Sequence, residues 1–549
     1  MTTYTMALVA LRRFVDKQLS KNRKRSPFEY VVLVTMGVLV AAVLKYPNRA
    51  FLTRARPDLK TPNGYPLFGN MPQMLRDQGN SLQSMNEGFK NLGNVYSLTI
   101  PLFGRVILVN TPEHFEHVLK TNFSNYIKGK IFSDNLQDIL GKGIFVADQE
   151  EWRFHRKTAS NIFTTKLYRQ LVQGAFKDSG MDLISVLEKS RLAQRSVDLQ
   201  ELFLKLTLDA FGKLTFGLEF EALRCEGPNE FGDAFDYLTA NVDGRMVNPF
   251  WFLTDRVIPG KVARVQGAIA VLDKFAAMAV KKRRNETPED KEKRPRDLLD
   301  HFINHVADDG SKLTDVELRD VFVNFMIAGR DTTAQGLTWQ FYSLMTNPRV
   351  MKNLVQEIDT VLQGSQDYTY EMMMNELPYL KAVFHETLRL YPPVPKNVKT
   401  AVDDDVLPGG IRVHKGDIIG ISTWCLGRNK EVWGEDAEQF VPERWLVPLD
   451  NSQTTTATPS NGAHGRSPFG KFKAESPYKF PSFNAGPRLC LGQTFATLEA
   501  LVTSTMLVQK YEFRLVPGQK PAIVKGSVTL PMANPLLTTV ATRVHKTIA

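Results

Sequence analysis

The chain has 549 residues, a formal net charge of +11 and 43% hydrophobic residues, which supports a large folded core and excludes global disorder. Its three cysteines, Cys225, Cys425 and Cys490, lie far apart and form no CxxC pair. That spacing excludes a disulfide framework and a structural zinc site, and it favours a reducing compartment. No ordered pattern of basic and aromatic residues indicates nucleic-acid binding.

The first predicted element is an apolar segment over residues 30–44 that carries no charge. A membrane-spanning helix needs about 20 residues, and Phe28, Lys45 and Tyr46 can extend the segment. No small-residue cleavage site follows it, so a retained anchor over residues 30–46 is favoured over a signal peptide. A buried core helix is disfavoured because the segment precedes the globular part.

The anchor separates a basic segment, residues 1–29, from a Pro- and Gly-rich connector, residues 47–72, and a large domain, residues 73–549. Basic residues flank the anchor on both sides, and the positive-inside rule alone would place the N-terminal tail in the cytosol. The function argued below requires a cytosolic domain instead. An interfacial helix over residues 6–17 would reconcile the two.

The domain is predicted to be mainly α with small β-sheets (α+β). Strand patterns occur at residues 95–100 and 106–109, and return at 411–421 and near Val528. Long helical patterns dominate between them. Residues 446–479 are rich in Ser, Thr, Gly and Pro and indicate a surface insertion.

A mainly basic stretch over residues 281–296 contains helix-breaking residues. The simpler interpretation is a solvated loop. The alternative is a docking surface for an acidic electron donor or for anionic lipid headgroups.

The most specific motif has the pattern FxxGxRxCxG and consists of Phe483, Gly486, Arg488, Cys490 and Gly492. Gly486 permits a tight bend, and the Cys490 thiolate is a metal ligand. The residues after Cys490 have helical periodicity, so N–H groups at a helix start should face the sulfur. A buried inert cysteine is the alternative for a lone residue, but the whole pattern disfavours it.

This segment resembles the haem-binding loop of the cytochrome P450 family, and three further motifs match that family in order and spacing. The resemblance implies a non-covalent haem b with Cys490 as its thiolate ligand. It places Arg488 at a propionate, and Gly492 where the macrocycle lies against the backbone.

The second motif, residues 328–333 (AGRDTT), lies in a predicted helix that begins at Thr314 and ends before Pro348. The resemblance implies that this helix crosses the distal haem face. Gly329 would open the helix for O2, and Asp331 and Thr332 would relay protons.

The remaining motifs concern charged side chains. An ExxR pair, Glu386 and Arg389, should join Arg444 of a PERW segment in a buried ion network with a structural role.

A WxxxR motif places Trp152 and Arg156 on one helix face, suited to one propionate, behind a predicted cap formed by Asp148 and Glu151. Lys399 is a further candidate for a propionate contact.

The resemblance implies a monooxygenase that inserts one atom of O2 into a C–H bond of a lipophilic substrate. Several runs, among them residues 125–130 and 403–410, look like the plant and fungal group that hydroxylates fatty acids and alkanes. A steroid or terpenoid substrate is the alternative. Ala328 stands where animal ω-hydroxylases carry the glutamate that bonds the haem, hence the non-covalent cofactor. The predicted pocket residues are Phe132, Leu136, Phe145, Phe325, Ala328, Val394, Val528 and Thr529.

No flavodoxin-like or dinucleotide-binding segment occurs in the sequence. The resemblance therefore implies that NADPH supplies electrons through a separate cytochrome P450 reductase, with cytochrome b5 as a second candidate donor. It also implies a single-pass protein of the endoplasmic reticulum membrane with a cytosolic catalytic domain. Two other classes stay open, an O2-independent thiolate-haem isomerase or dehydratase, which Thr332 disfavours, and a haem carrier or sensor.

Overall fold

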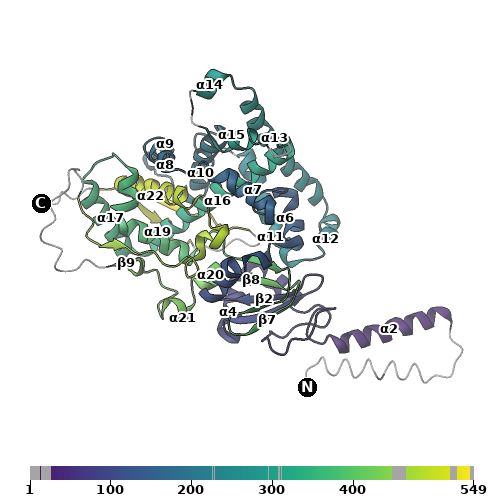
Figure 1. The fold of residues 1–549 in the computed structure, drawn as a ribbon. Helices are drawn as coiled ribbons and strands as arrows, with labels where there is room; N and C mark the ends of the chain where they lie inside the picture. Colours follow the sequence, from purple (N-terminus) through teal and green to yellow (C-terminus); the bar gives the residue numbers. More distant parts are fainter. Residues whose placement is uncertain are drawn as a thin grey trace.

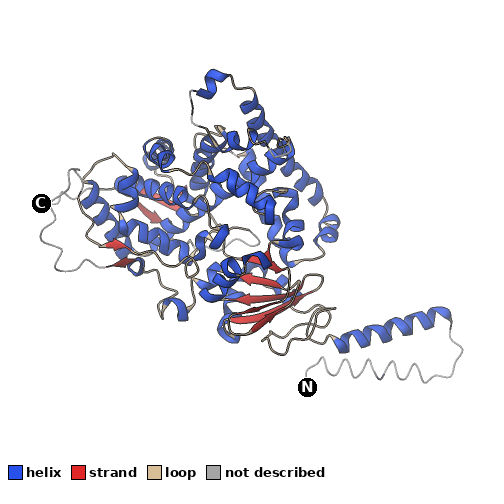
Figure 2. Cartoon of the chain, in the orientation of Figure 1, coloured by secondary structure: helices blue, strands red, loops and turns tan. Residues whose placement is uncertain are grey.

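The computed structural model describes Arg13, residues 26–447 except 226, 228, 293, 295, 307–309 and 311, and residues 465–519 and 528–544. Within these ranges the chain is a helix-rich body with small sheets at its edges (Figure 1, Figure 2). The predicted fold class is confirmed. The proposed interfacial helix at residues 6–17 lies outside the described residues, apart from Arg13.

The helices follow the chain in this order: α2 (Pro27–Lys45), α3 (Met71–Arg76), α4 (Ser81–Leu92), α5 (Pro112–Glu116), α6 (Gly129–Leu140), α7 (Gln149–Ser160), α8 (Thr165–Gln173), α9 (Ala175–Leu192), α10 (Leu199–Phe216), α11 (Glu230–Val247), α12 (Trp251–Val257), α13 (Lys261–Arg284), α14 (Pro288–Glu292), α15 (Leu298–Ile303), α16 (Asp315–Thr346), α17 (Pro348–Leu362), α18 (Tyr370–Asn375), α19 (Pro378–Leu390), α20 (Thr423–Leu426), α21 (Lys430–Trp433) and α22 (Gln493–Lys510).

The strands are β1 (Val95–Ile100), β2 (Gly104–Val109), β3 (Tyr126–Ile127), β4 (Val197–Asp198), β5 (Asn397–Ala401), β6 (Asp405–Leu407), β7 (Ile411–Val413), β8 (Ile418–Ile421), β9 (Leu446–Val447), β10 (Lys471–Phe472), β11 (Tyr511–Leu515) and β12 (Leu537–Thr542). The largest sheet has the order β1-β2-β8-β5-β3. Its β2–β8 pair is parallel and the others are antiparallel.

Helix α16 runs through the centre of the body, and almost every residue from Asp320 to Phe341 is buried. It begins as predicted, because the Thr314 and Glu317 side chains cap each other's backbone N–H groups. It ends at Thr346, directly before Pro348 begins α17. Because its apolar residues pack on all sides, α16 is a rigid support for any site along it.

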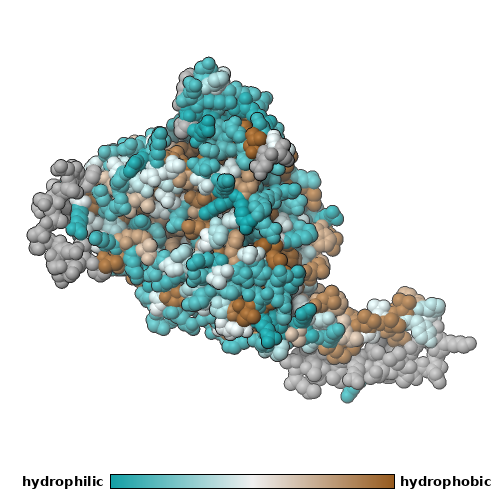
Figure 3. Space-filling model, in the orientation of Figure 1, coloured by the Kyte–Doolittle hydropathy of each residue, from teal (hydrophilic) through white to brown (hydrophobic). Residues whose placement is uncertain are grey.

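Helix α2 projects away from the body beside the largest sheet and forms an apolar rod in the hydropathy view (Figure 1, Figure 3). Its 19 residues have a mean hydropathy of 2.1, and none of its apolar window is buried in the protein. At 1.5 Å per residue the helix is about 28 Å long, close to the thickness of a bilayer core. Its length and composition therefore suit a single-pass membrane anchor.

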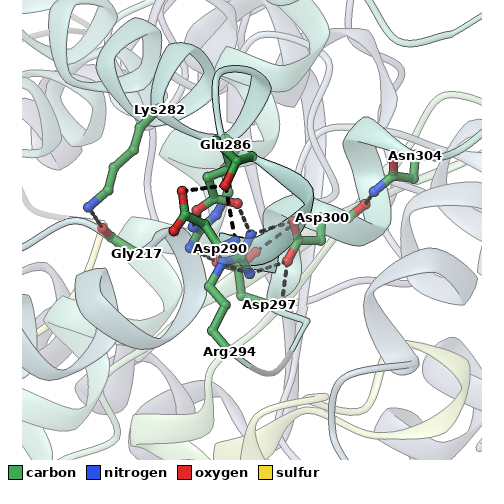
Figure 4. Close-up of polar contacts among 10 residues, drawn as sticks. Gly217, Lys282, Glu286, Asp290, Arg294, Asp297, Asp300 and Asn304 are labelled. Atoms are coloured by element: carbon green, nitrogen blue, oxygen red, sulfur yellow. Dashed lines mark hydrogen bonds and ion pairs between the residues drawn. The ribbon is translucent and has the colours of Figure 1, made fainter. Parts of the chain in front are cut away.

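Most of the described residues in the basic stretch at 281–296 are exposed, as predicted, but much of the stretch is helical and not a loop. Helix α13 continues to Arg284, and α14 follows at Pro288. Lys282 donates a hydrogen bond to the Gly217 carbonyl at 2.7 Å. A compact ionic network occupies the remainder (Figure 4). Its members are Arg283, Glu286, Arg294, Asp297 and Asp300.

This network is buried at its centre, where Arg283 is 5% exposed and contacts Glu286 and Asp297. Arg294 binds Asp300 at 2.6 Å and also contacts Glu286. The composition did not predict this network, in which acidic and basic side chains at the ends of two helices neutralise each other's charge. The docking surface stays a prediction.

Two other expectations change in detail. Val528 lies in a loop rather than a strand, and the strands nearby are β11 and β12.

The predicted insertion at residues 446–479 is tied to the body at both ends, where β9 pairs with β10. The Phe469 ring lies 4.4 Å from that of Tyr379. The middle of this segment, residues 448–464, lies outside the described residues.

Candidate active site

The loop before α22 is folded so that Cys490 is held by backbone contacts. The Cys490 N–H donates to the Phe483 carbonyl at 2.8 Å. Gly486 has a φ of 63°, and a Cβ there would lie 2.0 Å from the Leu119 carbonyl oxygen. Only glycine satisfies both conditions, so the predicted bend at Gly486 is confirmed.

Cys490 keeps accessible surface although protein groups surround it. Burial raises the pKa of the Cys490 thiol, while the Gly492 N–H and the Arg156 cation act in the opposite direction. The residue nevertheless counts as exposed. A Cβ on Gly492, the N-cap of α22, would contact only this sulfur, at 3.9 Å. The sulfur thus faces accessible space at a helix start, as a thiolate ligand requires.

Three buried cations gather near the same loop and share one carboxylate. Arg488 binds Asp148 at 2.9 Å. Lys128 donates to the Asn397 side chain at 2.8 Å, and Lys399 has no hydrogen-bond partner within the described residues. Burial and the neighbouring cations lower the pKa of Lys399 to about 7 and shift that of Lys128 well below its usual value. The lowered pKa values mean that burial and mutual repulsion disfavour the charged forms of these lysines, and an anionic group bound beside them would favour those charged forms.

The WxxxR helix, α7, supports this cluster in a way that the sequence did not predict. Its N-cap Asp148 makes no side-chain cap, so the predicted box with Glu151 is wrong. Asp148 instead accepts the N–H groups of Lys128 and Gly129 and the Arg488 guanidinium. The Asp148 carboxylate is therefore bound to Arg488 and does not cap α7.

Trp152 and Arg156 lie one helical turn apart and contact two different partners. The Trp152 ring lies 4.7 Å below the Arg488 guanidinium. Arg156 donates to the Leu489 carbonyl, next to Cys490. Both predicted residues thus lie beside the Cys490 loop, where Trp152 orients Arg488.

On α16, Ala328 and Thr332 are the two positions between Asp320 and Phe341 that keep accessible surface. They are four residues apart and therefore share one helix face. The Thr332 hydroxyl donates to the Ala328 carbonyl at 2.6 Å. This strip is the half-buried part of the segment from Asp320 to Phe341.

Gly329 makes a close packing contact that the sequence did not predict. It is buried, and a Cβ there would lie 2.2 Å from the Phe211 ring on α10. Gly329 lets α16 and α10 approach each other closely. The role of Gly329 in O2 access stays a prediction.

Asp331 is fully enclosed and paired with its neighbour Arg330 at 2.8 Å. Arg330 also binds Asp236 on α11 at 2.7 Å. Burial raises the pKa of Asp331 even though Arg330 opposes the shift. A carboxyl that takes up protons near neutral pH suits the predicted proton relay.

The three residues of the predicted ion network, Glu386, Arg389 and Arg444, are joined through the Glu386 carboxylate. Glu386 and Arg389 are fully buried and joined by two hydrogen bonds of 2.8 Å. Arg444 binds Glu386 at 3.0 Å, and the Trp445 indole donates to it at 2.9 Å. Arg389 donates to three further carbonyls, those of Gly427, Ala437 and Gln439.

The predicted pocket residues come from five segments: α6, the loop after it, α16, the loop that follows α19 and the loop that precedes β12. Phe145 and Val394 are 38% and 40% exposed, whereas Leu136, Phe325 and Thr529 are buried. Phe132, Ala328 and Val528 are half-buried. A separate groove of about 1040 Å³ lies between α6, α13 and α16, and no predicted pocket residue lines it.

Several buried charged residues escaped the sequence analysis, among them Lys128 and Glu499. Lys128 lies in a run quoted for its resemblance, but its partner Asn397 is 269 positions away. Glu499 interrupts the apolar pattern of α22, and its carboxyl oxygens have no hydrogen-bond partner within the described residues. Burial raises the pKa of Glu499 to about 8. The only sequence signal for Glu499 was a charged residue within the apolar pattern of α22.

These residues fit a haem. Cys490 presents its sulfur at the start of α22, and the basic side chains of Lys128, Lys399 and Arg488 match two propionates. Ala328 leaves no side chain that could bond a macrocycle. A single cysteine thiolate is the axial ligand typical of haem proteins that activate O2.

Comparison with known proteins agrees with this assignment. A family model described as Cytochrome P450 matches residues 59–538. The chain is 36% identical to "Cytochrome P450 monooxygenase cyp1" of Mycosarcoma maydis over 90% of this chain and 77% of that protein. It is 34% identical to two Arabidopsis thaliana proteins, Cytochrome P450 704B1, over 82% of this chain and 90% of that protein, and Cytochrome P450 86B1, over 83% and 81%.

Proposed function

Because the chain belongs to the cytochrome P450 family of monooxygenases, we propose that it hydroxylates a fatty acid or an alkane. The reaction takes a substrate C–H bond, O2, two electrons and two protons, and it yields the C–OH product and water. Haem, when bound, supplies the O2 activation. The observation that carries the monooxygenase part of the proposal is the Cys490 sulfur at the start of α22, beside the basic residues Lys128, Lys399 and Arg488.

The chain's own residues supply ligation, charge balance and protons. Cys490 ligates the iron, with the Gly492 N–H stabilising its negative charge. Lys128, Lys399 and Arg488 bind the propionates. Trp152 and Arg156 hold Arg488 and the Cys490 loop in place.

Thr332 and Asp331 would deliver protons, since burial raises the pKa of Asp331 while its ion pair with Arg330 opposes the shift. The strip formed by Ala328 and Thr332 faces the substrate. Glu386, Arg389 and Arg444 keep the surrounding core rigid.

The thiolate assignment is tested by comparing cysteine variants. The Cys490→Ser variant should lose the red-shifted Soret band that an axial thiolate gives the reduced CO complex. Cys225→Ser is the matched control, because Cys225 is exposed and remote in sequence from the loop, and it should retain the band. A red-shifted band in the Cys490→Ser protein would refute the assignment.

The substrate class rests on the resemblance of runs such as residues 125–130 to the plant and fungal lipid hydroxylases, and the apolar pocket candidates suit such substrates. A spectral titration of the holoenzyme with fatty acids from lauric to stearic should shift the Soret band, and steroids should not. Product formation should require NADPH, reductase and O2. A response to steroids alone would replace the fatty-acid assignment, and hydroperoxide rearrangement without reductase would replace the monooxygenase.

For location, the proposal is a single-pass anchor in the endoplasmic reticulum membrane with the catalytic domain in the cytosol, beside an NADPH-dependent P450 reductase. The exposed apolar helix α2 supports the anchor. Protease treatment of sealed microsomes should digest the domain without detergent. A protected domain would place it in the lumen.

A further inference from the structure

Helix α16 holds two loops of the predicted pocket through side chains beyond the AGRDTT motif. Gln335 lies three residues after Thr332 and is 3% exposed. Its amide oxygen accepts the Leu530 N–H, and its amide nitrogen donates to the Thr529 hydroxyl, both at 2.8 Å. One side chain therefore fixes both the backbone and a side chain of the loop that carries Thr529 and Val528.

Trp339, one turn further along, contacts the same loop and a second one. Its indole N–H donates to the Leu530 carbonyl at 2.8 Å. Its ring is stacked on Tyr391 with centroids 4.2 Å apart and planes 1° from parallel. Tyr391 caps α19 and begins the turn that carries Val394. The two loops are thus joined through Trp339.

The contacts are strong because they are buried. Trp339, Thr529 and Leu530 are 3%, 5% and 1% exposed, so water cannot replace a lost hydrogen bond without rearrangement. The far part of the loop has separate support, since Gln200 on α10 binds the Met532 backbone in both directions. Gln335 and Trp339 therefore control the near part, where Val528 and Thr529 lie.

We propose that Gln335 and Trp339 are positioning residues that set where a substrate is oxidised. The same rigid helix presents Thr332 and, through these two side chains, fixes Thr529 and Val394 relative to it. Helix α16 then determines the distance between the proton-delivering residues and the pocket wall. The inference relies on the proposed function for the substrate class, and not for the contacts themselves.

The Gln335→Leu variant tests the inference, with Gln340→Leu as its matched control. Gln340 is buried on the same helix but donates to Ser504 on α22. Both variants lose buried polar contacts, but only the first releases the pocket loop. Gln335→Leu should change the ratio of products oxidised at neighbouring carbons by about fivefold and lower product formed per NADPH. Gln340→Leu should leave both quantities unchanged.

A second readout does not depend on the substrate. The relative affinity of the ferric holoenzyme for imidazole and 4-phenylimidazole, measured from the Soret shift, reports the space above the haem. This ratio should change by about fivefold in Gln335→Leu and in Trp339→Phe, which keeps an aromatic ring but loses the donor to Leu530. It should stay constant in Gln340→Leu.

The outcomes separate the inference from the proposed function. If no fatty acid is hydroxylated but the azole ratio shifts as described, the substrate class is wrong and the positioning role stands. An unchanged azole ratio in haem-loaded Gln335→Leu and Trp339→Phe would overturn the positioning role. Equal changes in Gln335→Leu and Gln340→Leu would also overturn it, because they would indicate a general loss of packing. Trp339→Phe decides the matter if Gln335→Leu fails to bind haem.

Discussion

Two groups of buried charges flank the core of this protein, and they differ in how completely they are paired. In the network of Glu386, Arg389 and Arg444, every carboxylate oxygen and guanidinium has partners inside the protein. In the cluster of Lys128, Lys399 and Arg488, a single carboxylate, Asp148, faces three cations. The first group is complete as the chain folds. The second requires an additional anion.

This difference separates structural charge from binding charge. A buried ion that is fully paired contributes to a unique fold and has no capacity left for a ligand. A buried cation without a partner costs free energy, and the cost is recovered when an anionic ligand binds. Four expected results would sharpen or break this comparison.

The largest effect is expected in the closed network. Glu386→Gln removes the carboxylate that neutralises Arg389, whose side chain has no exposed surface. An uncompensated buried charge costs about 3–5 kcal/mol, a large share of a typical stability of about 5–15 kcal/mol. We expect little haem-loaded protein, measured as the reduced CO band per milligram. A normal yield with a normal melting temperature would contradict the structural role.

An opposite pattern is expected in the open cluster. Lys399→Met removes a buried amine that has no hydrogen-bond partner within the described residues, so the fold should not lose stability. Haem should instead be transferred to apomyoglobin about 10–100-fold faster, because a charge-assisted contact to a propionate is lost. Lys130→Met is the control, since this exposed lysine pairs with Asp134. Equal transfer rates in the two variants would show that Lys399 does not hold the haem.

The two groups also differed in how well the sequence predicted them. Glu386, Arg389 and Arg444 belong to short motifs, and spacing within a helix already places the first two on one face. The Cys490 loop and α16 were predicted for the same reason, since the bend at Gly486 and the cap at Thr314 are local features.

Features that depend on distant partners were missed or misassigned. Asp148 has the position of a helix cap, but Arg488, 340 residues later, takes its carboxylate. Lys128 binds Asn397 and Gln335 binds Leu530, and no local sequence pattern links either pair. The packing of Phe211 against Gly329 likewise joins residues that no local pattern links.

Haem retention by the open cluster should depend on pH. Burial and Arg488 lower the pKa of Lys399 to about 7. A propionate favours the charged lysine and raises that pKa, so binding takes up a proton above about pH 7 and not below it. Haem transfer should therefore accelerate from about pH 7 to about pH 9, by up to about tenfold per unit. Lys399→Arg, which stays charged, should flatten the profile, and an equally steep profile in that variant would exclude Lys399 as the titrating group.

The smallest effect is expected at Glu443, which stands beside Arg444 in the PERW segment but outside the closed network. It pairs with Arg349, whose side chain is 60% exposed, and accepts a hydrogen bond from Tyr379 at 2.9 Å. Solvent screens an ion pair of this kind, so Glu443→Gln should cost less than about 1 kcal/mol. The holoenzyme should keep its haem and melt within about 2 °C of the parent. Because Glu386→Gln makes the same chemical change 57 residues earlier in the chain, a loss at Glu443 as large as at Glu386 would mean that burial and complete pairing do not distinguish the two glutamates.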